Sequence, residues 1–171
     1  MRPVLLAAFL LPAAALAQED PAVGVAPVAD PDGTVIGEVR LSAMENGFVN
    51  VVVSLEGIPE GVHGVHLHEV GDCSADDFSS AGPHISGDAQ HGFDNPEGPH
   101  PGDLPNAHVQ GDGVLAAQFM TDRIALDDTM IFDADGSALI IHSNSDDYRT
   151  DPGGNAGDRI ACGEIVRAVD E

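Results

Sequence analysis

Eight histidines stand out among the 171 residues, because several of them lie at spacings that suit a metal site. His66 and His68 are two residues apart in the segment 62–68, whose valines, leucine and histidines favour an extended strand. Side chains alternate between the two faces of a strand, so both imidazoles point the same way. Two imidazoles on one face supply half of a metal site, although a histidine-rich surface strand would show the same pattern.

Further candidate ligands lie later in the chain. One set, at spacings of seven, nine and three residues, consists of His84, His91, His100 and Asp103. Three imidazoles and one carboxylate fill the tetrahedral shell of Zn²⁺ and leave no position open for water, so this site would be structural. The distant His142 could join His66 and His68, and an all-nitrogen set of this kind suits Cu²⁺.

The elements that must hold these residues are short β-strands. Glycine and proline are frequent, aromatic residues make up 4%, and no long stretch has the apolar period of a helix. Turn signals separate apolar runs, and we expect strands at residues 34–43, 47–55, 62–68, 114–120, 123–126, 138–142 and 160–168. With about eight strands, the sequence predicts an all-β, antiparallel Greek-key barrel or sandwich.

Two long polar segments interrupt the strand pattern. Residues 71–106 carry scarcely any strand signal, and residues 143–157 form a second polar loop. A loop as long as the first is normally functional or disordered, and metal binding would supply the ordering energy that apolar burial does not. Residues 18–31 also have little periodicity, and we expect them to form a loose start of the folded domain.

The first 17 residues have the pattern of a cleaved secretory signal. A short apolar run, Val4–Leu16, follows Arg2 and ends in the small-x-small sequence Ala15-Leu16-Ala17. The run is too short to span a membrane as a permanent helix, and the alternative is an apolar helix of the core. We therefore expect a signal peptide at 1–17 and a single domain at 18–171 that has no membrane anchor after cleavage.

The composition is strongly acidic. There are 29 acidic residues against 6 basic ones, all of them arginine, and the net charge is −23. Nucleic acid and anionic membranes need basic patches, so neither is an expected partner. The acidity could serve solubility in a salty setting or reflect compositional drift.

The two cysteines, Cys73 and Cys162, are expected to form one disulfide, because an exported chain meets an oxidising compartment. The bond would close a loop of about 90 residues and contribute roughly 4 to 5 kcal/mol in the chain-entropy model. Two buried free thiols are the alternative.

Taken together, these segments resemble the copper/zinc superoxide dismutases of the exported bacterial kind. The matching segments follow in family order from about residue 34 to residue 169, and they are 64–72, 80–84, 91–92, 100–104, 139–142 and 154–163. A single His-x-His is weak evidence, but six histidines, an aspartate, an arginine and two cysteines in order are specific.

The resemblance implies one copper and one zinc ion for each subunit. Its copper ligands would be His66, His68, His84 and His142, and its zinc ligands would be His84, His91, His100 and Asp103. His84 would then bridge the metals as an imidazolate and act in proton transfer. Arg159 would attract the anionic substrate, and Asp146 would link a copper ligand to a zinc ligand through hydrogen bonds.

The function that the resemblance implies is dismutation of superoxide to O₂ and hydrogen peroxide in the periplasm. A non-catalytic copper/zinc-binding protein or a copper chaperone on the same fold is the alternative, although such proteins often lack a copper ligand or the arginine. A zinc hydrolase fits poorly, because the zinc set has no open position. Exported relatives occur as homodimers and as monomers, so a homodimer stays open.

The remaining features modify this expectation without removing a ligand. We expect His63 to pack and donate hydrogen bonds near the copper ligands, His108 to lie on the surface, and Glu69 to point to the other face of its strand. The segment 85–88 differs from the aromatic and Asn-Pro that relatives often have there. The loop 143–157 has three aspartates, one arginine and no lysine, which predicts weak electrostatic steering of the substrate at low salt.

Overall fold

The computed structural model describes residues 24–168, and eight β-strands form one antiparallel sheet there. The strands are β1 Gly24–Ala29, β2 Val35–Ala43, β3 Val49–Leu55, β4 Gly61–His68, β5 Asp103–Val109, β6 Leu115–Thr121, β7 Ser137–His142 and β8 Arg159–Arg167. The signal peptide expected at 1–17 lies outside the described residues. Within 24–168 no helix is long and apolar enough to cross a membrane.

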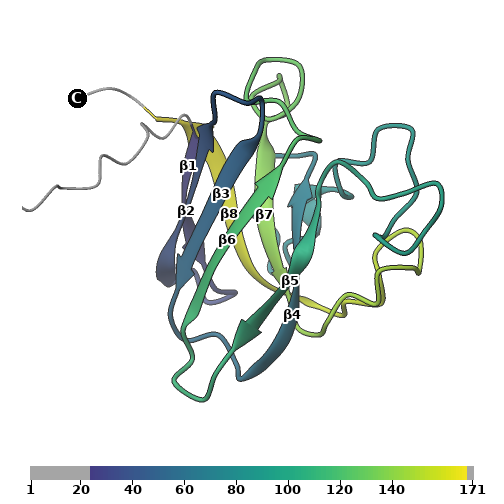
Figure 1. The fold of residues 1–171 in the computed structure, drawn as a ribbon. Helices are drawn as coiled ribbons and strands as arrows, with labels where there is room; N and C mark the ends of the chain where they lie inside the picture. The colour runs from purple at the N-terminus through teal and green to yellow at the C-terminus, as the bar shows by residue number, and fades with distance from the viewer. Residues whose placement is uncertain (1–23, 169–171) are drawn as a thin grey trace, which may run out of the picture.

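The sheet curls into a nearly closed barrel (Figure 1). Its strand order is β5-β4-β7-β8-β1-β2-β3-β6, so β3 lies beside β6 and β4 lies beside β7. These neighbours are distant in sequence, which is the crossover pattern of a Greek key. The predicted all-β Greek-key architecture is confirmed.

The barrel interior is filled by alternate residues of the strands. In β3, for example, Val49, Val51 and Val53 are buried, whereas Val52 and Ser54 are exposed. This period of two places one apolar face on the core and one face toward solvent. It matches the face assignment that the sequence predicts for this strand.

Strands β4 and β7 depart from this alternation, because they are buried on both faces. All six residues of β7 are buried; Leu139 and Ile141 face the barrel core, and Ile140 packs in a smaller cluster with Phe78 and Cys162. The two long loops cover this outer face, on the right-hand side of Figure 1. His66 and His68 therefore lie between the barrel wall and the loops.

Two expectations about where strands occur are wrong. The loose start expected at 18–31 is wrong for Gly24–Ala29, which form β1 and pair with both β2 and β8, while residues 18–23 lie outside the described residues. Small residues and Pro27 hide the alternation of β1 in the sequence, yet Ala26 and Val28 are fully buried. The long polar segment expected at 71–106 also ends earlier than predicted, because β5 begins at Asp103 and runs to Val109. Pro105 interrupts the apolar residues of this strand in the sequence.

The strand expected at 123–126 is absent. That segment lies in the connection 122–136 between β6 and β7, where Ile131 N donates to Ala125 O rather than to a neighbouring strand. Ile124 and Ile131 are buried in the core, so the apolar residues are used for packing without a strand. A short apolar run does not by itself distinguish the two outcomes.

The predicted disulfide is present between Cys73 and Cys162. It ties the start of the first long loop to β8, and Cys73 N also donates a 2.9 Å hydrogen bond to Glu164 Oε1 on the same strand. The loop is thus fixed to the barrel a few residues after β4 ends.

Candidate metal centre

The four histidines expected to bind copper converge in the structure. His66 and His68 come from β4, His142 from the end of β7, and His84 from the first long loop. All four are buried, and one ring nitrogen of each lies within 4.8 Å of those of the others. The loop histidine reaches the strand through an isolated bridge between His68 and His84.

A second group surrounds the carboxylate of Asp103, which is fully buried. Asp103 Oδ1 lies 3.1 Å from His84 Nδ1, 3.0 Å from His91 Nδ1 and 3.4 Å from His100 Nδ1. Tetrahedral Zn²⁺ with bonds of about 2.0–2.1 Å places its ligand atoms roughly 3.3 Å apart. The three distances from Asp103 Oδ1 are therefore compatible with zinc ligands.

The four residues around Asp103 whose ligand atoms all lie within 4.8 Å of one another are His66, His84, His91 and Asp103, so His66 stands in this set where the sequence predicts His100. The Nε2 of His66 is occupied by a 2.9 Å hydrogen bond with Asp146 Oδ2, which leaves only Nδ1 for a metal. If Nδ1 served the second group, the first group would keep three members. We therefore take His100 as the fourth member of the second group.

Unsatisfied nitrogens inside this cluster support metal binding. Among the described residues, six buried side-chain nitrogen atoms have no hydrogen-bond partner, and five of them are His66 Nδ1, His68 Nε2, His91 Nδ1, His100 Nδ1 and His142 Nε2. A buried polar atom without a partner is unfavourable, whereas a neutral imidazole nitrogen can bind a metal. Each of these atoms belongs to one of the two groups.

The opposite ring nitrogens are held by hydrogen bonds. His68 Nδ1 donates to Gly82 O at 2.8 Å, and His142 Nδ1 donates to Gly157 O at 3.3 Å. Asp146 accepts from both groups, with Oδ2 at 2.9 Å from His66 Nε2 and Oδ1 at 3.0 Å from His91 Nε2. Such bonds fix the tautomer and orientation of a metal-binding imidazole.

The remaining sequence candidates lie around the two groups. His63 is buried with Nδ1 at 2.8 Å from His142 O and Nε2 at 2.9 Å from Pro59 O, so neither nitrogen is available to a metal. His108 and Glu69 are exposed. Arg159 donates from Nη1 to Phe78 O and from Nη2 to Gly82 O, at 2.6 and 2.7 Å.

A surface cavity of about 280 Å³ lies at Arg159 and is also lined by Asp77, Ser79, Gly157 and Asp158. The carbonyl of Gly82 that accepts from Arg159 also accepts from His68. A single carbonyl thus links the guanidinium beside the cavity to the four-histidine group.

Comparison with known proteins agrees with this geometry. Residues 35–165 match the family model described as copper/zinc superoxide dismutase. The chain belongs to the copper/zinc superoxide dismutase family. Among its relatives, a Cu-Zn superoxide dismutase of Caulobacter vibrioides is 39% identical over 140 residues, which cover 78% of this chain and 80% of that protein.

Some of the matched proteins are named superoxide dismutase-like rather than superoxide dismutase. The superoxide dismutase-like protein YojM of Bacillus subtilis is 37% identical over 140 residues, covering 79% of this chain and 71% of the relative. A crystal structure of a double mutant of a superoxide dismutase-like protein from Bacillus subtilis has a TM-score of 0.79 at 36% identity, covering 84% of this chain and 97% of that one.

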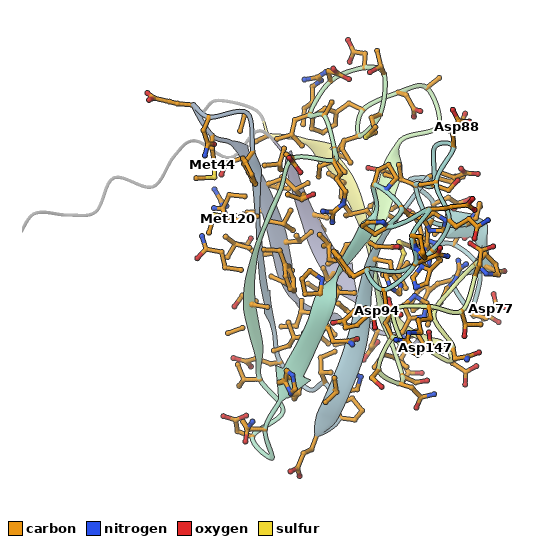
Figure 2. All side chains as sticks on the ribbon, turned by 45° about the vertical axis from the view of Figure 1, so that its right-hand side comes forward. Met44, Asp77, Asp88, Asp94, Met120 and Asp147 are labelled. Atoms are coloured by element: carbon orange, nitrogen blue, oxygen red, sulfur yellow. A yellow bond between two sulfur atoms is a disulfide. The ribbon has the colours of Figure 1, made fainter. Side chains whose placement is uncertain are left out.

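In the second long loop, aspartate side chains accept hydrogen bonds from residues of the two loops. Asp147 accepts from the main chain and hydroxyl of Thr150, and Asp151 Oδ1 accepts from His91 N at 2.8 Å. Arg149 pairs with Asp94 of the first loop at 3.2 Å. Figure 2 shows Asp94 and Asp147 on the loop side of the molecule, away from Met44 and Met120.

Burial keeps three of the four histidines in the first group neutral. It lowers the pKa of His66 to about 4, of His68 to about 2 and of His142 to about 3, because a buried charge loses its hydration. Neutral imidazole is the form that binds a metal, so these three are ready for binding at neutral pH.

In the second group, nearby carboxylates outweigh the lowering of a histidine pKa by burial. Burial opposes protonation of His91, but two nearby carboxylates outweigh it and raise its pKa to about 9. Asp103 Oδ1 lies 3.0 Å from Nδ1, and Asp146 accepts a hydrogen bond from Nε2. Burial likewise opposes ionisation of both aspartates, yet the hydrogen bonds from the histidines hold their pKa values well below the usual range. Metal binding at His91 therefore has to release a proton at neutral pH.

Sequence reasoning missed Gly154, on which the Asp146 bridge depends. Gly154 has φ +63°, and a Cβ there would lie 2.0 Å from Asp146 Oδ1 and 2.6 Å from His91 Nε2.

A Gly154→Ala substitution should displace the carboxylate of Asp146 from His66 and His91 and weaken zinc binding by about 10- to 100-fold, measured by competition with a chromophoric chelator. The neighbouring Gly153→Ala is the control, since its Cβ would meet nothing within 4 Å. Equal zinc affinities of the two variants would contradict the account.

The metal-free protein should lose stability as the pH falls from about 6.5 towards 4. In this window the unfolded chain takes up protons at His66, His68 and His142 that the folded chain does not. Unfolding is thereby favoured by up to about 1.4 kcal/mol for each pH unit and each histidine. At the upper end of this window His91 partly opposes the loss, because the folded state holds its proton more tightly than the unfolded chain does. The depressed carboxylate pKa values add to the loss below about pH 5.

Urea unfolding of the chelator-treated protein at pH 7 and pH 5 measures this dependence. His142→Ala should make the dependence shallower, whereas His108→Ala should leave it unchanged because His108 is exposed. A midpoint that does not move between the two pH values would rule out neutral buried histidines.

Proposed function

We propose that this protein dismutates superoxide, with copper in the four-histidine group and zinc in the group around Asp103. The observation that carries the proposal is the position of His84, which belongs to both groups. Its Nδ1 lies 3.1 Å from Asp103 Oδ1, which leaves Nε2 for the first group. An imidazole shared by the two groups suits two metal ions bound side by side better than it suits two separate metal sites.

The donor atoms suit these two metals. The first group offers four imidazoles, a set that Cu²⁺ accepts readily. The second offers three imidazoles and a carboxylate, which is a complete shell for Zn²⁺. Copper supplies the one-electron chemistry, by which two superoxide ions and two protons give one O₂ and one H₂O₂.

His84 is the residue that we propose to move a proton. As an imidazolate it would bind on both sides, and protonation of Nε2 would release that nitrogen from the first group while Nδ1 stays with the second. This nitrogen can then pass its proton to the reduced oxygen species. The rigid second group keeps the ring in place through the exchange, since Asp103 also accepts hydrogen bonds from Gly92 N and His100 N.

Arg159 is the residue that we propose to attract the substrate. Its guanidinium is half-buried, and two main-chain carbonyl oxygens fix its orientation beside the cavity. A fixed positive charge at the base of a cavity focuses the local field even where the net charge of the protein is negative. Asp158, the neighbouring residue, is exposed and lines the same cavity.

We further propose a periplasmic location. The disulfide fits an oxidising compartment, and the matched dismutase of Caulobacter vibrioides is bacterial. The signal peptide at 1–17 stays a prediction, which N-terminal sequencing of the exported protein would test.

The negative charge of Asp158 should slow capture of superoxide. Asp158→Asn should raise kcat/KM on the order of two- to three-fold at low ionic strength, and added salt should erase the gain. Asp88→Asn makes the same change in net charge at another exposed site and should have little effect. Pulse radiolysis or stopped-flow measurement gives the rates, and equal rates for the two variants would refute local control by this cavity.

The proposed function is tested by metal analysis and a superoxide assay of the copper- and zinc-loaded mature chain. His142→Ala should abolish activity and leave one zinc ion bound, because His142 belongs only to the first group. His108→Ala should retain full activity. One copper and one zinc with no turnover in the wild type would instead favour a non-catalytic metal-binding protein.

A further inference from the structure

Arg123 reaches the second metal group from outside the two long loops. It lies two residues after the end of β6, and its Nη2 donates a 2.7 Å hydrogen bond to the main-chain oxygen of Asp103. Asp103 is the first residue of β5, and β5 and β6 are the two edge strands of the sheet. This bond therefore joins the two edges of the barrel at the residue whose carboxylate lies at the centre of the zinc group.

The same guanidinium contacts the first long loop. Its central carbon lies 5.1 Å from the centroid of the Phe93 ring, within the range of a cation–π interaction. The Phe93 ring in turn meets Tyr148 of the second loop edge to face, with centroids 5.4 Å apart. Side chains from three separate segments thus form a row of contacts, which we call the Arg123 column: Arg123, Phe93 and Tyr148.

Two hydrogen bonds at Tyr148 extend this row of contacts. Tyr148 Oη accepts a 2.7 Å bond from Asn106 N on β5, and Tyr148 O accepts a 3.0 Å bond from Asp94 N. Phe93 is two residues from His91, and Tyr148 is two residues from Asp146. The column therefore connects the three segments that carry Asp103, His91 and the aspartate between the two metal groups.

An arginine here is not explained by packing alone. Its Nε is buried without a hydrogen-bond partner, and burial lowers the pKa of the guanidinium below its usual value. Burial of a charge is unfavourable, so an apolar side chain would be the simpler way to fill this space. What the arginine adds is a planar group that can donate to Asp103 O and stack on Phe93 at once.

We propose that Arg123 is a positioning residue for the zinc group. It fixes the main chain of Asp103 and, through Phe93 and Tyr148, sets the position of the two loops relative to that carboxylate. The inference rests on the proposed zinc assignment and concerns zinc affinity and geometry rather than catalysis.

The test compares Arg123→Met with Arg167→Met. Arg167 makes the same kind of stacking contact with Phe132, at 4.2 Å, and an ion pair with Asp128, but it contacts neither metal group. Chelator competition would measure Zn²⁺ and Cu²⁺ affinities, and urea unfolding would measure the stability of the metal-free proteins. Arg123→Met should lower zinc affinity by about 10- to 100-fold and copper affinity much less, while Arg167→Met changes neither.

Two further measurements separate positioning from a general loss of structure. Arg123→Lys keeps the charge but lacks the planar fork, so its zinc affinity should be intermediate. Co²⁺ bound in the zinc group should show altered visible bands in Arg123→Met and unaltered bands in Arg167→Met, since these bands report coordination geometry. Arg123→Lys and Phe93→Leu carry the test if Arg123→Met does not fold, and wild-type zinc affinity in both would overturn the inference.

Equal zinc affinities of Arg123→Met and Arg167→Met would also overturn it. A parallel loss of zinc affinity, copper affinity and metal-free stability in Arg123→Met would mean a merely structural role. If the wild-type protein itself bound no zinc, the proposed function would fail, which is a different result from failure of the Arg123 inference.

Discussion

The structure depends on a set of buried histidine rings. In each ring one nitrogen is fixed by a hydrogen bond and the other has no hydrogen-bond partner. Gly82 O, Gly157 O and the carboxylate of Asp146 accept from one side of four rings, and the opposite nitrogens point into the cluster without partners. A cluster of this kind is costly in an empty protein, because burial prevents protonation of His66, His68 and His142 and leaves polar atoms unsatisfied. Metal binding would remove that cost, which would couple folding of the loops to metal binding.

The two long loops complete this arrangement. The barrel supplies His66, His68 and His142 on strands whose inner faces are packed in the core, so these rings have little freedom. The first long loop supplies His84, His91 and His100, Asp103 begins β5, and the loops cover the outer face of β4 and β7. The disulfide, the Asp146 bridge and the Arg123 column tie the loops to the barrel at separate points.

Much of this could be predicted from sequence, because it depends on local patterns. The strand alternation places His66 and His68 on one face, and the order of the ligands along the chain identifies the family. The contacts of Asp151, Gly154 and Arg123 could not be predicted, since each joins segments that are distant in sequence. Strand β1 was missed because its alternating residues are small, and β5 because Pro105 breaks its pattern.

A single imidazole, that of His84, is proposed to join the two metal groups. Loading both groups with Cu²⁺ and recording the electron paramagnetic resonance spectrum tests it most directly. Exchange coupling through a shared imidazolate should suppress the signal of the two-copper protein far below that of two isolated ions. A double-integrated intensity equal to two independent Cu²⁺ ions would contradict the account.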